Sequence, residues 1–192
     1  IYAQVLVTEG NALARQANIT DATAKYEQAL ALNRALKIVP DAEAKKVALP
    51  AQIELGRELL ASAAFTPGLA AFAAAQIISP TADITATLSA AEWNNVCWRG
   101  SLAGLAAEVM PACERAVVLA PGDGSIRDSR GLALALTGDT DGAIQDFSFA
   151  VQWGEAGTGH ERLVAIRKSW IEELLAGKNP FDAVTLEELR SE

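Results

Sequence analysis

Few side chains in this sequence are of a type that could carry out covalent chemistry. The chain has two cysteines, Cys97 and Cys113, and a single histidine, His160. A cysteine nucleophile needs a base beside it to form the thiolate, and His160 lies in the C-terminal tail. These three residues also cannot complete a zinc site without several carboxylates placed beside them. We therefore expect no catalytic residue, no metal site and no enzyme activity within this segment.

The segment GDGS at 122–125 is a second chemical candidate, because glycine-rich turns can bind phosphate groups. A phosphate-binding loop also needs a lysine and a preceding strand, and this segment lacks both. We interpret it as a turn that leads into a helix, and we expect the chain to bind no cofactor.

Charge and composition argue against two further classes of function. The 192 residues carry a formal net charge of −8, whereas a surface that binds nucleic acid needs clustered Lys and Arg. No apolar run approaches the ~18–20 residues of a membrane-spanning helix. Hydrophobic residues make up 51% of the chain but aromatic residues only 6%, so alanine supplies much of the apolar content. We expect helices rather than a β-sandwich, and no partner among nucleic acids or membranes.

The sequence begins Ile1-Tyr2-Ala3, without an initiator Met or the layout of a signal peptide. We interpret it as an excised piece of a longer, cytoplasmic protein, in which any catalytic function belongs to the preceding part.

A repeat organises the chain. When residues 93–151 are aligned with themselves at an offset of 34 residues, positions of similar size coincide: Cys97 with Gly131, Gly104 with Gly138, Val109 with Ala143, Cys113 with Phe147, and Ala116 with Ala150. A small residue is followed 12 residues later by a second small or short one, 16 later by a bulky one and 19 later by alanine. The same series starts at Gly10 and at Gly56. A self-match near 34 residues is typical of stacked helix pairs.

Each repeat is predicted to be two antiparallel helices, with the small residues where the helices cross and the bulky one in the gap to the next pair. Between the first two repeats we expect an overlong second helix and an overlong next first helix, interrupted near Pro40 and Pro50. The helix that contains Cys113 should start late or bend, because Pro111 is tolerated only in a first turn.

Helix caps support this division. Ser89 with Glu92 forms a capping-box pattern, Ser125 with Asp128 can begin a helix that ends before Gly138, and Asp139 or Thr140 can cap the next one.

The tail departs from the repeat. It carries an apolar stripe at helical spacing, made by Leu163, Ile166, Trp170, Ile171 and Leu174. Gly177 and Pro180 should end that helix, and Thr185 with Glu188 should begin a short terminal one. We divide the chain into repeats over 1–155, at about 1–40, 41–80, 89–122 and 124–155, and a C-terminal capping helix with a short terminal helix over 156–192.

The repeat resembles the tetratricopeptide repeat (TPR) family. The residues that carry the resemblance are Trp93 with Val96, Ala116 with Pro121, and Gly131 with Ala143, Phe147 and Ala150. It implies an all-α, TPR-like α-solenoid of about four antiparallel helix pairs. The segment from Trp93 to the NPFD tail also looks like a C-terminal repeat module of large bacterial proteins, which implies a regulatory or assembly role in a multidomain chain.

In this family the first helices of the pairs line a concave face where partner peptides lie. Carried over to this chain, the resemblance implies groove residues Asn11, Arg15, Glu54, Arg57, Asn94, Trp98, Ser101 and Asp128. Asn94, Trp98 and Ser101 step by four and three residues, so one helical face presents them together. Two interpretations of Trp98 stay open: it is an interaction hot spot in the groove, or it packs under the inserts or the tail.

Cys97 and Cys113 lie on the two helices of one repeat, near their crossing. They are close enough for a disulfide, but the interpretation we favour is two buried thiols in a reducing compartment.

The function predicted from these features is a protein–protein interaction or regulatory sensing module that binds a protein or peptide partner, or another domain of its own chain, in the groove. The alternatives are a self-assembly module that forms homo-oligomers, and a domain that senses a peptide or small ligand against Trp98 and Arg57.

Overall fold

The computed structural model describes residues 1–191, apart from the side chain of Thr85. These residues form helices and turns without a strand, so the predicted all-α fold is confirmed. The chain divides into two compact units, Ile1–Thr87 (unit 1) and Leu88–Glu192 (unit 2), which are described separately.

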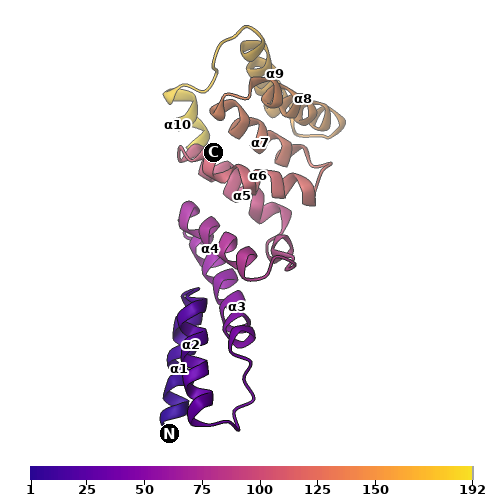
Figure 1. The fold of residues 1–192 in the computed structure, drawn as a ribbon. Helices are drawn as coiled ribbons and strands as arrows, with labels where there is room; N and C mark the ends of the chain where they lie inside the picture. The colour runs from indigo at the N-terminus through magenta and orange to yellow at the C-terminus, as the bar shows by residue number, and fades with distance from the viewer. Residues whose placement is uncertain (192) are drawn as a thin grey trace. The chain divides into compact units, whose positions relative to one another are not determined.

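Unit 1 contains two helix pairs and a short 3₁₀ helix, coloured indigo to magenta in Figure 1. Its elements are α1 (Tyr2–Arg15), α2 (Ile19–Leu32), α3 (Pro40–Ala61), α4 (Phe65–Ile78) and η1 (Ile84–Thr87). Helix α1 packs along α2 and helix α3 along α4, and α3 also packs against α1 and α2.

Unit 2 contains two further pairs and two C-terminal helices. Its elements are α5 (Ala90–Leu102), α6 (Ala106–Leu119), α7 (Gly124–Thr137), α8 (Thr140–Ala156), α9 (Glu161–Leu175) and α10 (Ala183–Ser191). Helix α5 packs along α6 and helix α7 along α8, while α9 packs on α8. The last helix, α10, returns to lie against α5 (Figure 1). The predicted arrangement of four helix pairs followed by a capping helix and a short terminal helix is therefore present.

One contact recurs where the two helices of a pair cross. A Cβ atom added to Gly10 would lie 2.7 Å from the ring of Tyr26, one added to Gly56 would lie 2.9 Å from the ring of Phe72, and one added to Gly131 would lie 2.9 Å from the ring of Phe147. Since Cβ atoms do not approach other atoms so closely, each ring lies directly on a glycine backbone. The bulky residue of the repeat therefore fills the crossing within its own pair.

The third pair replaces this contact with a covalent bond. Cys97 and Cys113, also 16 residues apart, form a disulfide between α5 and α6, and both residues are fully buried. The interpretation as two free thiols was wrong. Because disulfides persist mainly in oxidising compartments, the argument from reduced cysteines no longer supports the predicted cytoplasmic location.

A second recurring feature is the turn inside each pair. Seven residues after the small residue at the crossing, the backbone is left-handed at Ala17, Ala63, Gly104 and Gly138, with φ of 60°, 62°, 84° and 90°. A residue with a Cβ atom adopts this conformation at a cost, whereas glycine adopts it freely. The backbone is therefore strained in the two turns that have alanine at this position, Ala17 and Ala63.

The segment between the first two pairs differs in part from the prediction. Helix α2 ends at Leu32, so the expected overlong second helix was wrong. The Asn33 side chain accepts the backbone N–H of Ala35, which stabilises a local turn in place of further helix. The overlong first helix is present, because α3 spans 22 residues and begins with Pro40 in its first turn. The predicted interruption near Pro50 was wrong, because α3 continues through this residue.

Two helix starts were predicted wrongly. Asp123 caps α7 and Asp182 precedes α10, where its carboxylate accepts the backbone N–H of Thr185. The cap is thus an aspartate two or three residues before the Ser or Thr that the patterns favoured.

Of the two alternatives predicted for the helix that contains Cys113, a late start is not found. Helix α6 begins at Ala106 and continues through Pro111, because the carbonyl of exposed Ala107 can bond to water where proline offers no donor. A bend at Pro111 stays a prediction.

Two cap predictions are confirmed. Ser89 and Glu92 form the capping box of α5, and Asp139 caps α8. Among the described helices, none combines the length and the apolarity required to cross a membrane.

Replacing Ala63 with glycine is expected to stabilise unit 1. The left-handed conformation costs alanine about 1–2 kcal/mol, which glycine does not lose. Glycine also makes the unfolded chain more flexible, and this lowers the free energy of unfolding by about 0.4–1 kcal/mol. Urea denaturation should show a gain of about 0.5–1 kcal/mol in the free energy of unfolding. Gly138→Ala is the matched reverse change and should destabilise unit 2; a destabilised Ala63→Gly variant would contradict the strain.

Replacing both Cys97 and Cys113 with alanine is expected to lower the free energy of unfolding of unit 2 by about 3 kcal/mol, the usual effect of a disulfide that closes a loop of about 15 residues. Thermal and urea denaturation measure the loss. Thiol titration of the denatured, unreduced chain should find no free thiol, and two titrating thiols would contradict the cross-link.

Candidate functional site

The four candidate residues of unit 1 lie on α1 and α3. The side-chain oxygen of Asn11 accepts the Tyr26 hydroxyl at 2.7 Å, which joins it to the ring at the helix crossing. The carbonyl of Arg15 accepts the side-chain amide of buried Gln52 at 2.8 Å, and this bond links α1 to α3. Glu54 and Arg57 are exposed, and the Arg57 guanidinium donates to the carbonyl of Thr87. These contacts stabilise unit 1, and the groove role of the four residues stays a prediction.

The four candidates of unit 2 differ in their surroundings. Asn94 and Trp98 are half-buried on α5, while Ser101 is 1% exposed. The Asn94 side-chain oxygen and the Ser101 hydroxyl are buried without a hydrogen-bond partner in the described part of the chain. Asp128, on α7, is buried and its carboxylate binds Arg167. Trp98 and Ser101 therefore come together at one end of α5, whereas the carboxylate of Asp128 is already bound.

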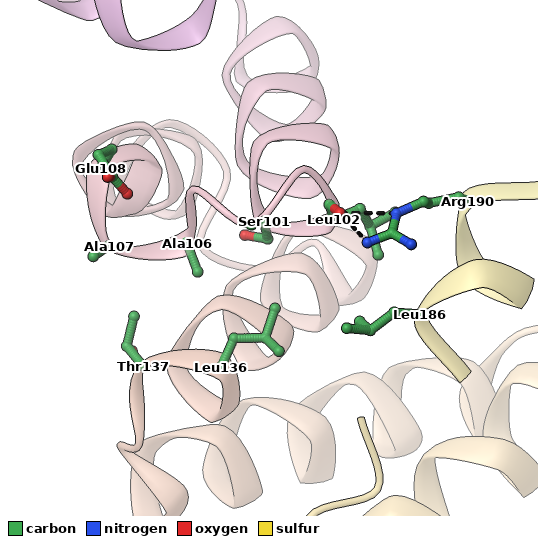
Figure 2. Close-up of a pocket in the computed structure, with 10 residues that line it drawn as sticks. Ser101, Leu102, Ala106, Ala107, Glu108, Leu136, Thr137, Leu186 and Arg190 are labelled. Atoms are coloured by element: carbon green, nitrogen blue, oxygen red, sulfur yellow. Dashed lines mark hydrogen bonds between the residues drawn. The ribbon is translucent and has the colours of Figure 1, made fainter. Parts of the chain in front are cut away.

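Two pockets open at this end of α5. The first, about 420 Å³, is lined by Asn95, Trp98, Arg99, Leu102 and Ala103 of α5 and by Leu189 and Arg190 of α10. The second, about 370 Å³, is lined by Ser101 and Leu102, by the start of α6, by Leu136 and Thr137, and by Leu186 and Arg190 (Figure 2). Leu102 and Arg190 border both pockets, so α10 lies between them. We call the surface formed by Trp98, Ser101, Leu102 and Ala103 the α5 face.

Helix α10 binds the α5 face through one apolar and one polar contact. Leu189 is 6% exposed and belongs to the buried core cluster of unit 2, together with Leu102, Phe147 and Trp170, and Leu186 packs against this cluster. Arg190 donates from Nε and Nη2 to the carbonyl of Leu102 at 2.9 and 2.8 Å (Figure 2). Leu102 is the last residue of α5, where helical carbonyls lack partners within the helix and the macrodipole is negative. Arg190 therefore acts as a C-terminal cap for α5.

The segment before α10 is anchored separately. The Phe181 ring lies 4.8 Å from the ring of Trp170 and 6.0 Å from the ring of Phe147. The rings of Phe147 and Trp170 are 5.4 Å apart, and all three are buried. This aromatic cluster binds the connection between α9 and α10, whatever contacts α10 itself makes.

Two buried charged clusters connect α7 to its neighbours. Asp146 is 1% exposed and accepts from Arg127 at 2.6 Å and from Arg130 at 2.6 and 2.9 Å. The hydrogen bond to Asp146 raises the pKa of Arg130. Asp128 accepts from Nε and Nη2 of Arg167 at 2.8 and 2.7 Å. Bidentate pairs of this kind hold α7 against α8 and α9.

The sequence reasoning missed both clusters, as well as Leu102 and Arg190. The spacing of Leu186 and Leu189 on the predicted terminal helix, followed directly by Arg190, is the signal that marks this helix as amphipathic.

The groups of the α5 face can recognise a ligand through apolar contact and hydrogen bonds. Elsewhere, the cysteines are bonded to each other, and the ring of His160 lies 4.7 Å from that of Trp153. Among the described residues, no group of three His, Cys, Asp or Glu side chains could hold a metal ion. The absence of enzyme activity stays a prediction.

Comparison with known proteins finds likeness in structure but none in sequence. No protein-family model matches the chain, and no curated protein matches it. The crystal structure of the TPR domain of P58(IPK) is similar over 91% of this chain, with 17% sequence identity and a TM-score of 0.44. The chain spans about half of that structure, 47% of its length. The all-α arrangement of helix pairs is established by the helices of this chain and the contacts between them.

Asp128→Ala is expected to lower the free energy of unfolding of unit 2 by about 3–5 kcal/mol, because it leaves the buried Arg167 without its partner. Asp128→Leu combined with Arg167→Met removes both charges and should cost less. Lys168→Ala breaks the exposed pair with Glu155 and should cost less than about 1 kcal/mol. Urea denaturation compares the three, and equal losses for the single Asp128 variant and the Lys168 control would contradict the role assigned to the buried pair.

Proposed function

We propose that this chain is a protein-interaction module and that unit 2 binds a segment of another protein on the α5 face. The observation that carries the proposal is that α10 of the same chain already lies there, with Leu189 buried and Arg190 bonded to Leu102. A surface that binds one short helix has the groups required to bind another segment of similar chemistry.

The composition of the face supports this proposal. Trp98 and Leu102 provide an apolar centre, and Asn95 and Arg99 are exposed at its border. Protein interfaces commonly have an apolar centre and a polar rim, with Trp and Arg among the residues that contribute most to affinity. The Arg99 guanidinium forms no hydrogen bond or ion pair within the described residues, so it is available to a partner.

The shape of the face favours a polypeptide over a small molecule. Small ligands are usually enclosed in one deep cavity. Here two neighbouring pockets share Leu102 and Arg190 at their common border, and exposed side chains such as Ala103 form part of their walls. An extended or helical segment can reach both pockets at once.

A regulatory role within a longer protein, a cytoplasmic location and self-assembly stay predictions from the sequence. We favour binding of a partner segment because α10 provides an example of an occupant of the α5 face.

The test is selection of peptides from a random phage-displayed 12-residue library on the immobilised full chain. Ala103→Arg places a long charged side chain in the first pocket at an exposed position, and it should reduce the binding of selected peptides at least tenfold. Val118→Arg is the matched control, because Val118 is 73% exposed on α6 and lines neither pocket.

Circular dichroism should show equal helical content in both variants. Failure to select any peptide, or equal binding of the selected peptides to both variants, would contradict the proposed function. Sedimentation of the wild-type chain over a range of concentrations distinguishes self-assembly, because a dimer that Ala103→Arg abolishes would assign the face to a second copy.

A further inference from the structure

The way α10 lies on the α5 face describes the chemistry of what the face accepts. Leu186 and Leu189 are three residues apart and therefore share one side of the helix. Arg190 follows directly, and it reaches the carbonyl at the end of α5. The complementary groups on the face are apolar side chains and a carbonyl without a partner in its own helix. The features of α10 that contact the face are therefore two leucines on one side of a short helix and the arginine that directly follows them.

The contacts of α10 are few. Leu189 is the one residue within α10 that is buried, and Val184 on its outer side is 67% exposed. The side chain of Arg190 is 44% exposed, so water can replace its hydrogen bonds. A helix of nine residues also has little stability of its own once it leaves the surface.

Most of the core of unit 2 is fixed without α10, which contributes one buried residue, Leu189. Phe181 is fixed by Trp170 and Phe147 before α10 begins, and the disulfide and the Asp128–Arg167 pair lie elsewhere in the unit. Release of residues 183–191 would remove Leu189 from the core cluster and uncover Trp98 and Leu102, while these other contacts keep the remaining helices of the unit in place.

We propose that α10 is a displaceable occupant of the α5 face and that the partner docks through a short amphipathic helix with the same pattern, two apolar residues three apart followed by arginine. This inference rests on the proposed function and names both the class of partner segment and its competitor. The partner can bind only while α10 has left the face. The apparent affinity for the partner is therefore its intrinsic affinity multiplied by the fraction of molecules in which the face is free.

The test measures the binding of a fluorescein-labelled peptide of residues 179–191 to the full chain by fluorescence anisotropy. Leu189→Asp in the protein should release α10, because it places a charge against the apolar face. Val184→Asp introduces the same charge on the outer side of α10 and is the matched control. We expect the peptide to bind Leu189→Asp at least tenfold more tightly than it binds the wild-type or Val184→Asp chains.

Two further measurements keep the inference falsifiable. A peptide that itself carries the Leu189→Asp change, and a scrambled peptide of the same composition, should not bind the released face. If Leu189→Asp loses helical content beyond α10, Arg190→Ala replaces it, because that exposed side chain can be removed without leaving a buried cavity.

Equal binding to the wild-type chain and to a folded release variant, no binding to either, or equal binding of the scrambled peptide would overturn the inference. None of these results contradicts the proposed function if peptides selected from the library still bind the wild-type chain and bind the Ala103→Arg variant more weakly. A wild-type dimer that exchanges α10 between copies would assign the face to a second copy and would also overturn the inference.

Discussion

Each helix pair of this chain depends on a contact between residues 16 positions apart. In three pairs an aromatic ring lies on a glycine, and in the pair of α5 and α6 a disulfide takes the same place. An added Cβ atom would collide with the ring, so the glycine sets how closely the two helices can approach. The left-handed turn seven residues after the glycine then returns the chain along the first helix. The repeat in the sequence therefore reflects one packing geometry that all four helix pairs share.

The exchange of a ring for a disulfide places the covalent link next to the candidate site. Cys97 precedes Trp98 directly, and the α5 face continues from Trp98 to Ala103. A disulfide constrains the chain without needing a large apolar core around it. Helix α5 is thus fixed to α6, and the pockets and α10 lie at its C-terminal end. A rigid helix is a suitable support for a recognition surface.

The sequence predicted those features that repeat or that are local. Gly131 with Phe147 and the capping box of Ser89 are examples, because periodic size and short-range hydrogen bonds are visible in the residues themselves. It missed the partners of Asp128 and Leu102, which lie 39 and 88 residues away, because single, non-repeated contacts leave no period in a sequence. The spacing also placed Cys97 beside Cys113, but spacing does not report their oxidation state.

Helix α10 covers the α5 face and places Leu189 in the core cluster of unit 2, and we propose that it opens without unfolding the rest of that core. Hydrogen–deuterium exchange of the unmodified full chain tests this separate opening, because local opening and global unfolding give different protection. Backbone amides of α10 are expected to exchange at least about tenfold faster than those around Trp170 in α9. Equal protection of α10 and α9 would show that the two helices open together, and it would contradict a displaceable α10.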